Sequence, residues 1–477
     1  MGEEINGCVF SQADFDGFRK RLEAEQAILE RWFHEGRFSE RQPRGGFELE
    51  AWLVDHRCAP LARNGDFLHA LGSDLVTWEL SQFNVELNNI PCDLSGDGLR
   101  RLQGGMDGLW RHCQDCARQL GARLVMIGIL PTVRQADLGL QSISPLARYR
   151  ALNDQVLALR GGAPIEVDIE GRDHLRIAHG NLMLESATTS FQVHLQAPFS
   201  RARALYNASY LASAPVVGLA ANSPYLFGRE LWCETRIPLF EQAANVNVST
   251  PGGGPWPQRV SFGSGYVSTN LIESFTKNCW QHPVLLPVHM DAAPETLRHL
   301  RLHNGTIWRW NRPLLGFDED GTPHLRIEHR VIGAGPCIAD SVANAAFYFG
   351  LATALSQGEP LVEGQLPFAT AKQNFYAAAK YGLEAEVTWI GGKRMRLDAL
   401  VLHWLLPMAA LGLEQLGLDG SDIDTYLGIL EGRARSGQTG AVWQRGFIAR
   451  HGVDFGAMTH AYAERSDSGR PVHEWDF

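Results

Sequence analysis

The chain has 477 residues, 45% of them hydrophobic and 20% charged, which supplies a large core and excludes a disordered protein. Its formal net charge of −10 argues against a nucleic-acid-binding protein, because neutralising phosphates requires clustered lysine and arginine. The negative charge serves solubility, and it also suits a site that gathers carboxylates around cations such as Mg²⁺. Small polar substrates are therefore the expected partners.

The N-terminal residues MGEEINGCVF lack the basic and apolar regions of a signal peptide, and no uninterrupted apolar stretch approaches about 18 residues. We therefore expect a cytoplasmic protein that does not act in a membrane. The eight cysteines are expected to be reduced thiols. Cys113 and Cys116 form a CxxC motif, but no second Cys or His pair is nearby, so we favour core thiols over a zinc or redox site.

The first predicted elements are a helix and a strand. Residues 11–36 place apolar side chains at helical spacings with charges between them, which predicts an amphipathic helix. Residues 47–54 alternate between apolar and polar side chains, which predicts a strand with Glu48 and Glu50 on one face.

Strands and helices then alternate along the chain. We predict strands at 78–90, 124–131 and 190–199, a hairpin at 166–177, and helices at 95–120 and 201–221. Residues 249–257 hold three glycines and three prolines, which predicts a loop; the sequence does not decide whether this loop is a lid over bound substrates.

The last two predicted strands, 306–317 and 324–332, are separated by the turn sequence DEDGTP, and the chain beyond 338 has an almost entirely helical pattern. Short antiparallel hairpins favour an α+β fold over a doubly wound parallel sheet. We expect a single catalytic domain, 1–477, with helical segments at 1–40 and 338–477.

Carboxylates that share a strand face are the first candidate site residues. Glu48 and Glu50 would repel each other unless cations lie between them, which suggests a metal site, although a solvated strand face is the more common explanation of such a pair on its own. Glu79 and Glu86 in WELSQFNVELNN add two acids, or else form a polar strand edge. His194 lies among apolar residues of a predicted strand; a lone histidine there is more often structural than a ligand.

Cationic residues accompany these acids. Glu328 and Arg330 share one face of a predicted strand, either as a metal ligand beside a phosphate-binding guanidinium or as a simple ion pair. Arg236 and Arg312 follow segments rich in helix and strand breakers. Phosphoryl transfer from ATP needs such a set, because Mg²⁺ and arginine offset phosphate charge, and the chain has no Walker loop or GxGxxG motif.

Six motifs, in order along the chain, give a family resemblance. They are GGFELEAWLVD, SQFNVELNNIP, LMLESATTSFQVHLQ, LAANSPYLFG with ETRIPLF, IWRWNRP with LRIEHRV, and YAAAKYGLEA. Over about residues 40–390 the chain resembles the glutamate-cysteine ligase type 2, or carboxylate-amine ligase, superfamily. That resemblance implies a glutamine synthetase-like catalytic fold, with a curved, mainly antiparallel sheet flanked by helices. His329 inside the E-x-R strand and the tail from 360 to 477 depart from the pattern.

The resemblance also implies roles for the candidate residues. Glu50, Glu79 and Glu86 would hold one Mg²⁺, and Glu48, His194 and Glu328 a second, with Mn²⁺ as an alternative ion; His194 would also contribute to the nucleotide site. Arg236, Arg312 and Arg330 would be catalytic and face the γ-phosphate and an acyl phosphate.

The implied reaction joins a carboxylate, from glutamate, to an amine, from cysteine, at the expense of ATP. A different acid and amine, a guanidino kinase on the same fold, or a non-catalytic nucleotide or amino-acid sensor are the alternatives. The superfamily also suggests a homodimer. His299 and His303 have i,i+4 spacing, which fits a metal pair less well than two structural helix-end histidines.

Overall fold

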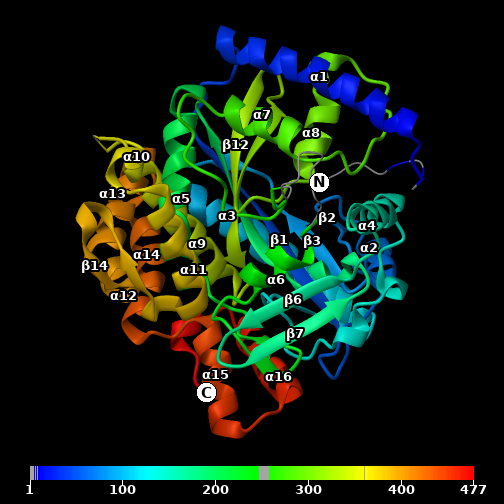
Figure 1. Cartoon of the computed structure of the whole chain (residues 1–477). Helices are drawn as coiled ribbons and strands as arrows, with labels where there is room; N and C mark the ends of the chain where they lie inside the picture. Colours follow the sequence, from blue (N-terminus) through cyan, green and yellow to red (C-terminus); the bar gives the residue numbers. More distant parts are fainter. Residues whose placement is uncertain (1–4, 6, 8, 247–256, 359) are drawn as a thin grey trace.

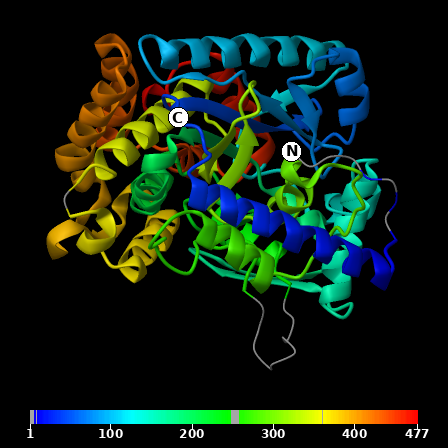
Figure 2. The ribbon, with the colours of Figure 1, turned by 90° about the horizontal axis from the view of Figure 1, so that it is seen from above.

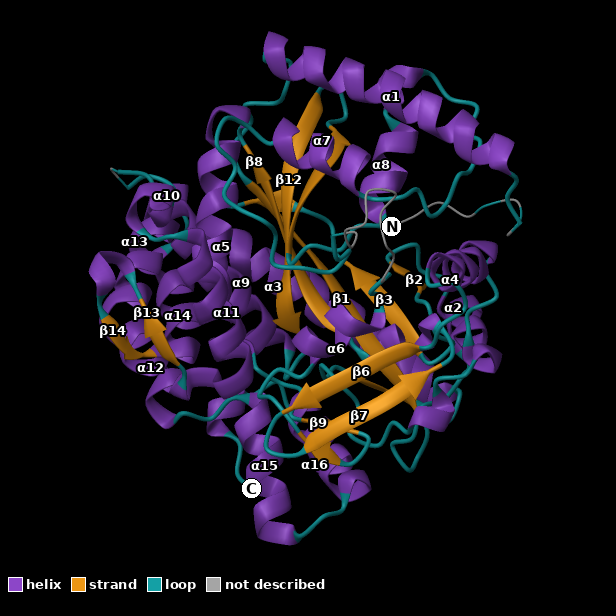
Figure 3. Ribbon diagram, in the orientation of Figure 1, coloured by secondary structure: helices purple, strands orange, loops and turns teal. Residues whose placement is uncertain are grey.

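The computed structural model describes residues 5, 7, 9–246, 257–358 and 360–477. The strands of its main sheet are β1 (Arg44–Val54), β2 (Val76–Trp78), β3 (Asn84–Asn88), β4 (Cys92–Asp93), β5 (Arg123–Val125), β8 (Ser190–Ala197), β11 (Asn311–Phe317) and β12 (Pro323–Gly333). Their order is β11-β12-β8-β1-β3-β2, with β4 and β5 also pairing with β1, and the pairings are antiparallel. This confirms the predicted α+β fold with an antiparallel sheet (Figure 3).

Three two-stranded hairpins lie outside the main sheet. They are β6 (Ile165–Glu170) with β7 (His174–His179), β9 (Tyr225–Leu226) with β10 (Arg229–Glu230), and β13 (Glu386–Thr388) with β14 (Arg394–Arg396). The first is the hairpin predicted at 166–177, and the last lies within the segment after 338 that the sequence predicts to be almost entirely helical.

The helices surround the sheet. They are α1 (Gln12–Glu35), α2 (Asn64–Leu71), α3 (Gly98–Gln119), α4 (Ala147–Leu159), α5 (Ala202–Ala220), α6 (Arg236–Ala243), α7 (Ile272–Gln281), α8 (Arg298–Gly305), α9 (Ile338–Leu355), α10 (Val362–Gln365), α11 (Phe368–Tyr381), α12 (Leu397–Leu400), α13 (Leu406–Leu416), α14 (Gly420–Ser436), α15 (Gly440–His451) and α16 (Phe455–Asp467). The helices from α9 to α14 gather at one side of the molecule in Figure 1.

The two faces of the sheet differ in chemistry. One is apolar: Leu49, Val193 and Ile327 are fully buried there, and α5 and α9 pack against the strands. The other carries charged side chains and is covered by α7 and α8, with α1 outside them. The view from above places α1 and α3 on opposite sides of the sheet (Figure 2). Burial of the apolar face supplies most of the folding free energy and leaves the charged face for a site.

Helix α9 is the central helix of the apolar core. By length and composition, Ile338–Leu355 and Leu397–Leu416 could each cross a membrane, but 89% of the first and 44% of the second is buried inside the protein. The high hydropathy of α9 is therefore explained by its contacts with α5, α13 and α14.

Three strand predictions are wrong in detail. The strand predicted at 306–317 begins only at Asn311, because Arg309 and Trp310 pair with Ser261 instead. Residues 78–90 form a hairpin of β2 and β3, because Gln82 N–H donates to the Ser142 carbonyl (2.7 Å) and turns the chain. Residues 124–131 are strand only up to Val125, because Thr189 then bonds the Ile127 and Gly128 carbonyls in place of a neighbouring strand. The loop predicted at 249–257 lies, apart from Pro257, outside the described residues.

Candidate active site

The antiparallel register aligns the predicted site residues across the middle of the charged face. Arg312 on β11 lies opposite Glu328 on β12, and Glu328 lies opposite His194 on β8. On β1, Glu50 lies opposite Glu86 of β3. Directly opposed residues point to the same face, so a row of polar groups crosses β11, β12, β8, β1 and β3.

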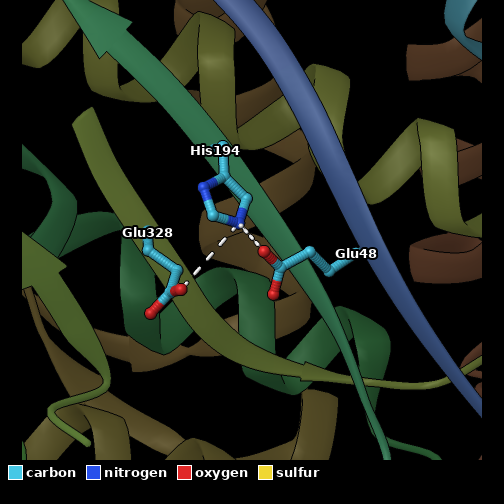
Figure 4. Close-up of side chains that lie close together, drawn as sticks. All are labelled: Glu48, His194 and Glu328. Carbon is cyan, nitrogen blue, oxygen red and sulfur yellow. Dashed lines mark ion pairs between the residues drawn. The ribbon is translucent and has the colours of Figure 1, made fainter. Parts of the chain in front are cut away.

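Glu48, His194 and Glu328 form the first cluster, which we name the histidine triad (Figure 4). The Nε2 atom of His194 is 3.2 Å from Glu48 Oε1 and 3.9 Å from Glu328 Oε1. Neither ring nitrogen of this buried histidine has a hydrogen-bond partner among the described residues. A buried imidazole between two carboxylates, without a hydrogen bond, has the chemistry of a metal ligand.

Arginines neutralise this triad. Arg312 donates from Nε to Glu328 Oε2 (2.6 Å) and from Nη2 to Oε1 (2.8 Å), and Arg330 Nη1 lies 3.1 Å from Oε2. Burial opposes ionisation of Glu328, but Arg312 and then Arg330 hold its pKa far below the usual range. Burial likewise opposes ionisation of Glu48, but His194 lowers its pKa to about 2. Both carboxylates are therefore ionised at neutral pH.

Glu50, Glu79 and Glu86 form the second cluster, which we name the glutamate triad; one oxygen of each lies within 4.8 Å of the others. Burial, followed by the charge of Glu79, raises the pKa of Glu50 to about 7. Burial, followed by Glu48 and Glu79, raises the pKa of Glu86 well above its usual value. Three acids with raised pKa values that lie this close together favour a bound divalent cation.

Hydrogen bonds hold the glutamate triad in place. Glu50 accepts from the Ser190 N–H (2.6 Å), the Ser190 hydroxyl (2.9 Å) and Gln192 Nε2 (2.9 Å). Glu86 accepts from Asn88 Nδ2 (2.9 Å). Glu50 is therefore oriented by the neighbouring strand β8, and Glu86 by a residue of its own strand, before any ion binds, as the ligands of metal sites usually are.

The glutamate triad and the two carboxylates of the histidine triad, Glu48 and Glu328, lie in the wall of one cavity of about 360 Å³. The charged residues that line it are Glu48, Glu50, Glu79, Glu86, Glu185, Glu328, Arg148, Arg298, Arg301, Arg312, Arg326 and Arg330. Apolar side chains of the segment from α7 to β11, such as Phe275, Met290 and Trp308, form part of the opposite wall. A cavity of this volume with converging charged groups has the size and chemistry of a small-molecule site.

A second cavity, of about 280 Å³, adjoins the first at Glu48 and Arg326. Arg44, His194 and His324 are among its polar lining residues. The histidine triad therefore borders both cavities, which leaves space on two sides of it for parts of different substrates.

Arg236 differs from the other predicted site residues in its position. The sequence predicts that it faces the phosphates, but it is absent from the cavity wall. It is buried behind the wall, where its Nε is 3.3 Å from Glu234 Oε1 and its Nη2 donates to the Arg330 carbonyl (3.1 Å). Its guanidinium also stacks on Trp310, 5.3 Å from the ring centroid. This placement supports Arg330 and does not expose Arg236 to a substrate.

Several cavity residues were not among the sequence candidates. Gln192 and Arg326 each lie two residues before a candidate on the same strand. Side chains two residues apart on a strand share a face, so this alternation could have predicted both. Glu185, in the 3₁₀ turn before β8, and Arg301, on α8, have no comparable local signal because only the tertiary fold brings them to the cavity.

The CxxC motif and the His299–His303 pair both have the surroundings of structural residues. Cys113 and Cys116 are buried, unpaired cysteines on α3, and burial raises the pKa of Cys113 to about 12. His299 Nδ1 lies 2.6 Å from Glu25 Oε1, whereas His303 Nε2 bonds the Asn278 carbonyl (2.9 Å). Separate partners for the two histidines support the helix-end interpretation.

The family assignment follows from the whole chain. The sequence profile of glutamate-cysteine ligase family 2 (GCS2) matches residues 44–464. The chain belongs to this family. It is accordingly an ATP-dependent ligase that joins a carboxylate to an amine, as the six motifs predict. No curated protein matches the sequence.

Solved structures have the same fold as this GCS2 member. A glutamate-cysteine ligase from Francisella tularensis, determined in complex with AMP, has a TM-score of 0.58 at 12% identity over 92% of this chain and 90% of that one. A bifunctional glutathione synthetase from Pasteurella multocida has a TM-score of 0.52 at 12% identity over 93% of this chain and 54% of that one. The predicted ligase fold is thereby confirmed.

Proposed function

We propose that this GCS2 ligase joins the γ-carboxylate of glutamate to the amine of cysteine through an acyl phosphate formed from ATP. The observation that carries the proposal is the convergence of all five triad carboxylates in the wall of one cavity, with His194 between two of them. The family, and the glutamate-cysteine ligase among the similar structures, support this pair of substrates.

The donor chemistry fits two divalent cations of the Mg²⁺ or Mn²⁺ type. Carboxylate oxygens dominate both triads, and hard cations prefer oxygen ligands. The histidine triad would hold one ion and the glutamate triad the other. When bound, such ions offset charge on the transferring phosphoryl group and its leaving oxygen.

The arginines of the chain orient and neutralise anionic groups. Arg312 and Arg330 are fixed on Glu328 with their remaining N–H groups close to the cavity, so we assign them to the γ-phosphate and the acyl phosphate. We assign Arg236 to positioning Arg330, because it contacts the carbonyl of that residue from behind.

No side-chain nucleophile is required in this mechanism. The substrate carboxylate attacks the γ-phosphate, ADP leaves, and the amine then displaces phosphate from the acyl phosphate. The fixed carboxylates and arginines therefore contribute orientation and electrostatic stabilisation, which are the main terms in phosphoryl transfer.

The test is ADP release from the purified protein with Mg·ATP and pairs of amino acids, with the amide product identified by mass spectrometry. ADP and γ-glutamylcysteine formed only when both amino acids are present would support the proposal. A different amide would change the substrate pair, a phosphorylated guanidino compound would indicate a kinase, and nucleotide binding without ADP would indicate a sensor. Glu328→Gln is the matched inactive control.

A further inference from the structure

The carboxylate of Glu185 is the one acidic group of the described cavity wall that belongs to neither triad. Glu185 lies in the 3₁₀ turn Leu182–Ala187, which Asn181 begins by accepting from the Met183 N–H (2.9 Å). The Glu185 carbonyl accepts from the Thr188 N–H (3.0 Å) and hydroxyl (2.8 Å). The backbone therefore fixes where this side chain enters the cavity.

The Glu185 side chain has no hydrogen bond or ion pair among the described residues. Every other carboxylate of the cavity wall belongs to one of the two triads. A half-buried carboxylate without a protein donor is unfavourable, because it gives up part of its water without a replacement. Its electrostatic neighbours are Glu79, Glu50 and Arg330. Burial, followed by Glu79 and Glu50, raises the pKa of Glu185 to about 8. A cationic ligand group would relieve this imbalance.

We propose that Glu185 binds the ammonium group of the amine substrate and accepts the proton that it loses before attack. The inference rests on the proposed function, which supplies an acyl phosphate and an amine. A metal ion is the less suitable occupant, since Glu185 is absent from both clusters of converging ligand atoms. Its neighbours Glu50 and Arg330 lie where the two triads meet, so an ammonium held by Glu185 would lie beside the acyl group.

The proposed step balances in atoms and charge. The ammonium transfers one proton to the Glu185 carboxylate, and the nitrogen lone pair then forms the C–N bond. The C–O bond to phosphate breaks, and the departing phosphate takes the second proton from nitrogen. The products are the amide, hydrogen phosphate and protonated Glu185, which returns its proton to water.

Hydroxylamine separates this role from the rest of catalysis, because it is uncharged at neutral pH and attacks acyl phosphates without first losing a proton. The assay supplies Mg·ATP and glutamate, with either cysteine or hydroxylamine as the amine, or the acid and amine that the ADP screen selects. We expect Glu185→Gln to slow amide formation by about 10²- to 10⁴-fold, the usual contribution of a general base. Hydroxamate formation should change by no more than a few fold.

Glu166→Gln, at an exposed position on β6, is the matched control and should leave both rates unchanged. Glu185→Asp keeps a carboxylate at a shorter reach and should recover part of amide formation. Equal losses with both amines, or no loss with either, would overturn the assignment. If the wild-type protein forms neither amide nor hydroxamate, the ligase proposal itself fails and the role of Glu185 fails with it.

Metal binding supplies the second readout. Titration with Mn²⁺ should give the same number of bound ions for wild type and Glu185→Gln, because the substituted residue belongs to neither triad. Loss of one ion in the variant would make Glu185 a metal ligand and would contradict the ammonium role. The melting temperature should not fall, since glutamine replaces a carboxylate that has no hydrogen-bond partner to lose.

Discussion

The histidine triad and the glutamate triad lie side by side on one sheet face, yet the protein balances their charge differently. Arg312 and Arg330 contact Glu328 directly, and the pKa values of Glu328 and Glu48 are lowered. In the glutamate triad all three pKa values are raised; burial is the largest cause for each, followed by a neighbouring acid for Glu50 and Glu86. The first triad is nearly neutralised by the chain itself, whereas the second depends on a cation from outside.

This difference suggests a division of labour. A preformed ion-pair network can hold phosphate-binding arginines in place whether or not a metal is bound. A cluster of acids with raised pKa values lowers the stability of the metal-free protein and raises its affinity for a divalent ion. Substitutions in the two triads should therefore have opposite effects on the stability of the metal-free protein.

Glu328→Gln should have the largest effect. Glutamine keeps the volume but removes the charge that faces Arg312 and Arg330, so both activity and stability should fall. We expect ATP turnover to fall by at least about 10³-fold and the free energy of unfolding to fall by about 3 kcal/mol. ADP release and urea unfolding measure the two quantities. Unchanged turnover would exclude this site for phosphoryl transfer.

Glu86→Gln should lower activity but stabilise the metal-free protein. Because folding raises the pKa of Glu86 above 4.5, the stability that its protonated form contributes is present below about pH 4.5 and is lost as the pH rises. With EDTA present, the free energy of unfolding of the variant should therefore equal that of wild type below this pH. Above it, the variant should become more stable than wild type, by up to about 1–2 kcal/mol.

Magnesium should make wild type more stable than Glu86→Gln at neutral pH, the reverse of the order expected with EDTA. Added Mg²⁺ should raise the melting temperature of wild type more than that of Glu86→Gln, because only wild type keeps the complete glutamate triad. At 100 times its dissociation constant an ion bound to the native state adds about 2.7 kcal/mol. A variant that is less stable than wild type at every pH would show that the three acids do not repel one another.

The difference between the triads could not be predicted from sequence. Period-two alternation correctly places Glu48 with Glu50, and Glu328 with Arg330. The family motifs imply the same two sets, of five acids and His194 together, that lie close to one another in the fold. No local pattern shows that Arg312 lies opposite Glu328, because that contact depends on the register between β11 and β12. The arrangement of charges therefore required the fold.

The same limit explains the misplaced elements. A single strand at 78–90 satisfies the local pattern, but bonds to Ser142, which is distant in sequence, make it a hairpin and place Glu79 in the turn. Arg236 has the expected residue type after a breaker-rich segment, yet it is the first residue of α6 and is directed toward Glu234. In both cases a tertiary contact overrides the local signal.

Arg236→Lys should have a smaller effect than Arg312→Lys. Lysine keeps the charge beside Glu234 but loses the planar stacking on Trp310 and the bond to the Arg330 carbonyl. We expect about a 10-fold fall in kcat, as is typical for groups that orient a ligand from behind. Arg312→Lys should cost about 100-fold, because a bidentate contact in the cavity wall is lost. Equal losses would indicate that Arg236 also contacts a substrate.

Cys113→Ala should have the smallest effect on activity. It shows what a loss of stability does to activity when the site is left unchanged. Cys113 is fully buried in the apolar core, away from both triads, and the raised pKa of its thiol excludes a reactive thiolate at neutral pH. Removing the sulfur should reduce the free energy of unfolding by about 1 kcal/mol while kcat/KM stays within about twofold. Urea unfolding and ADP release on the same preparation test this. Glu328→Gln also destabilises the protein. If Cys113→Ala is destabilised but stays active, loss of stability does not by itself abolish turnover, and the lost turnover of Glu328→Gln is due to the histidine triad.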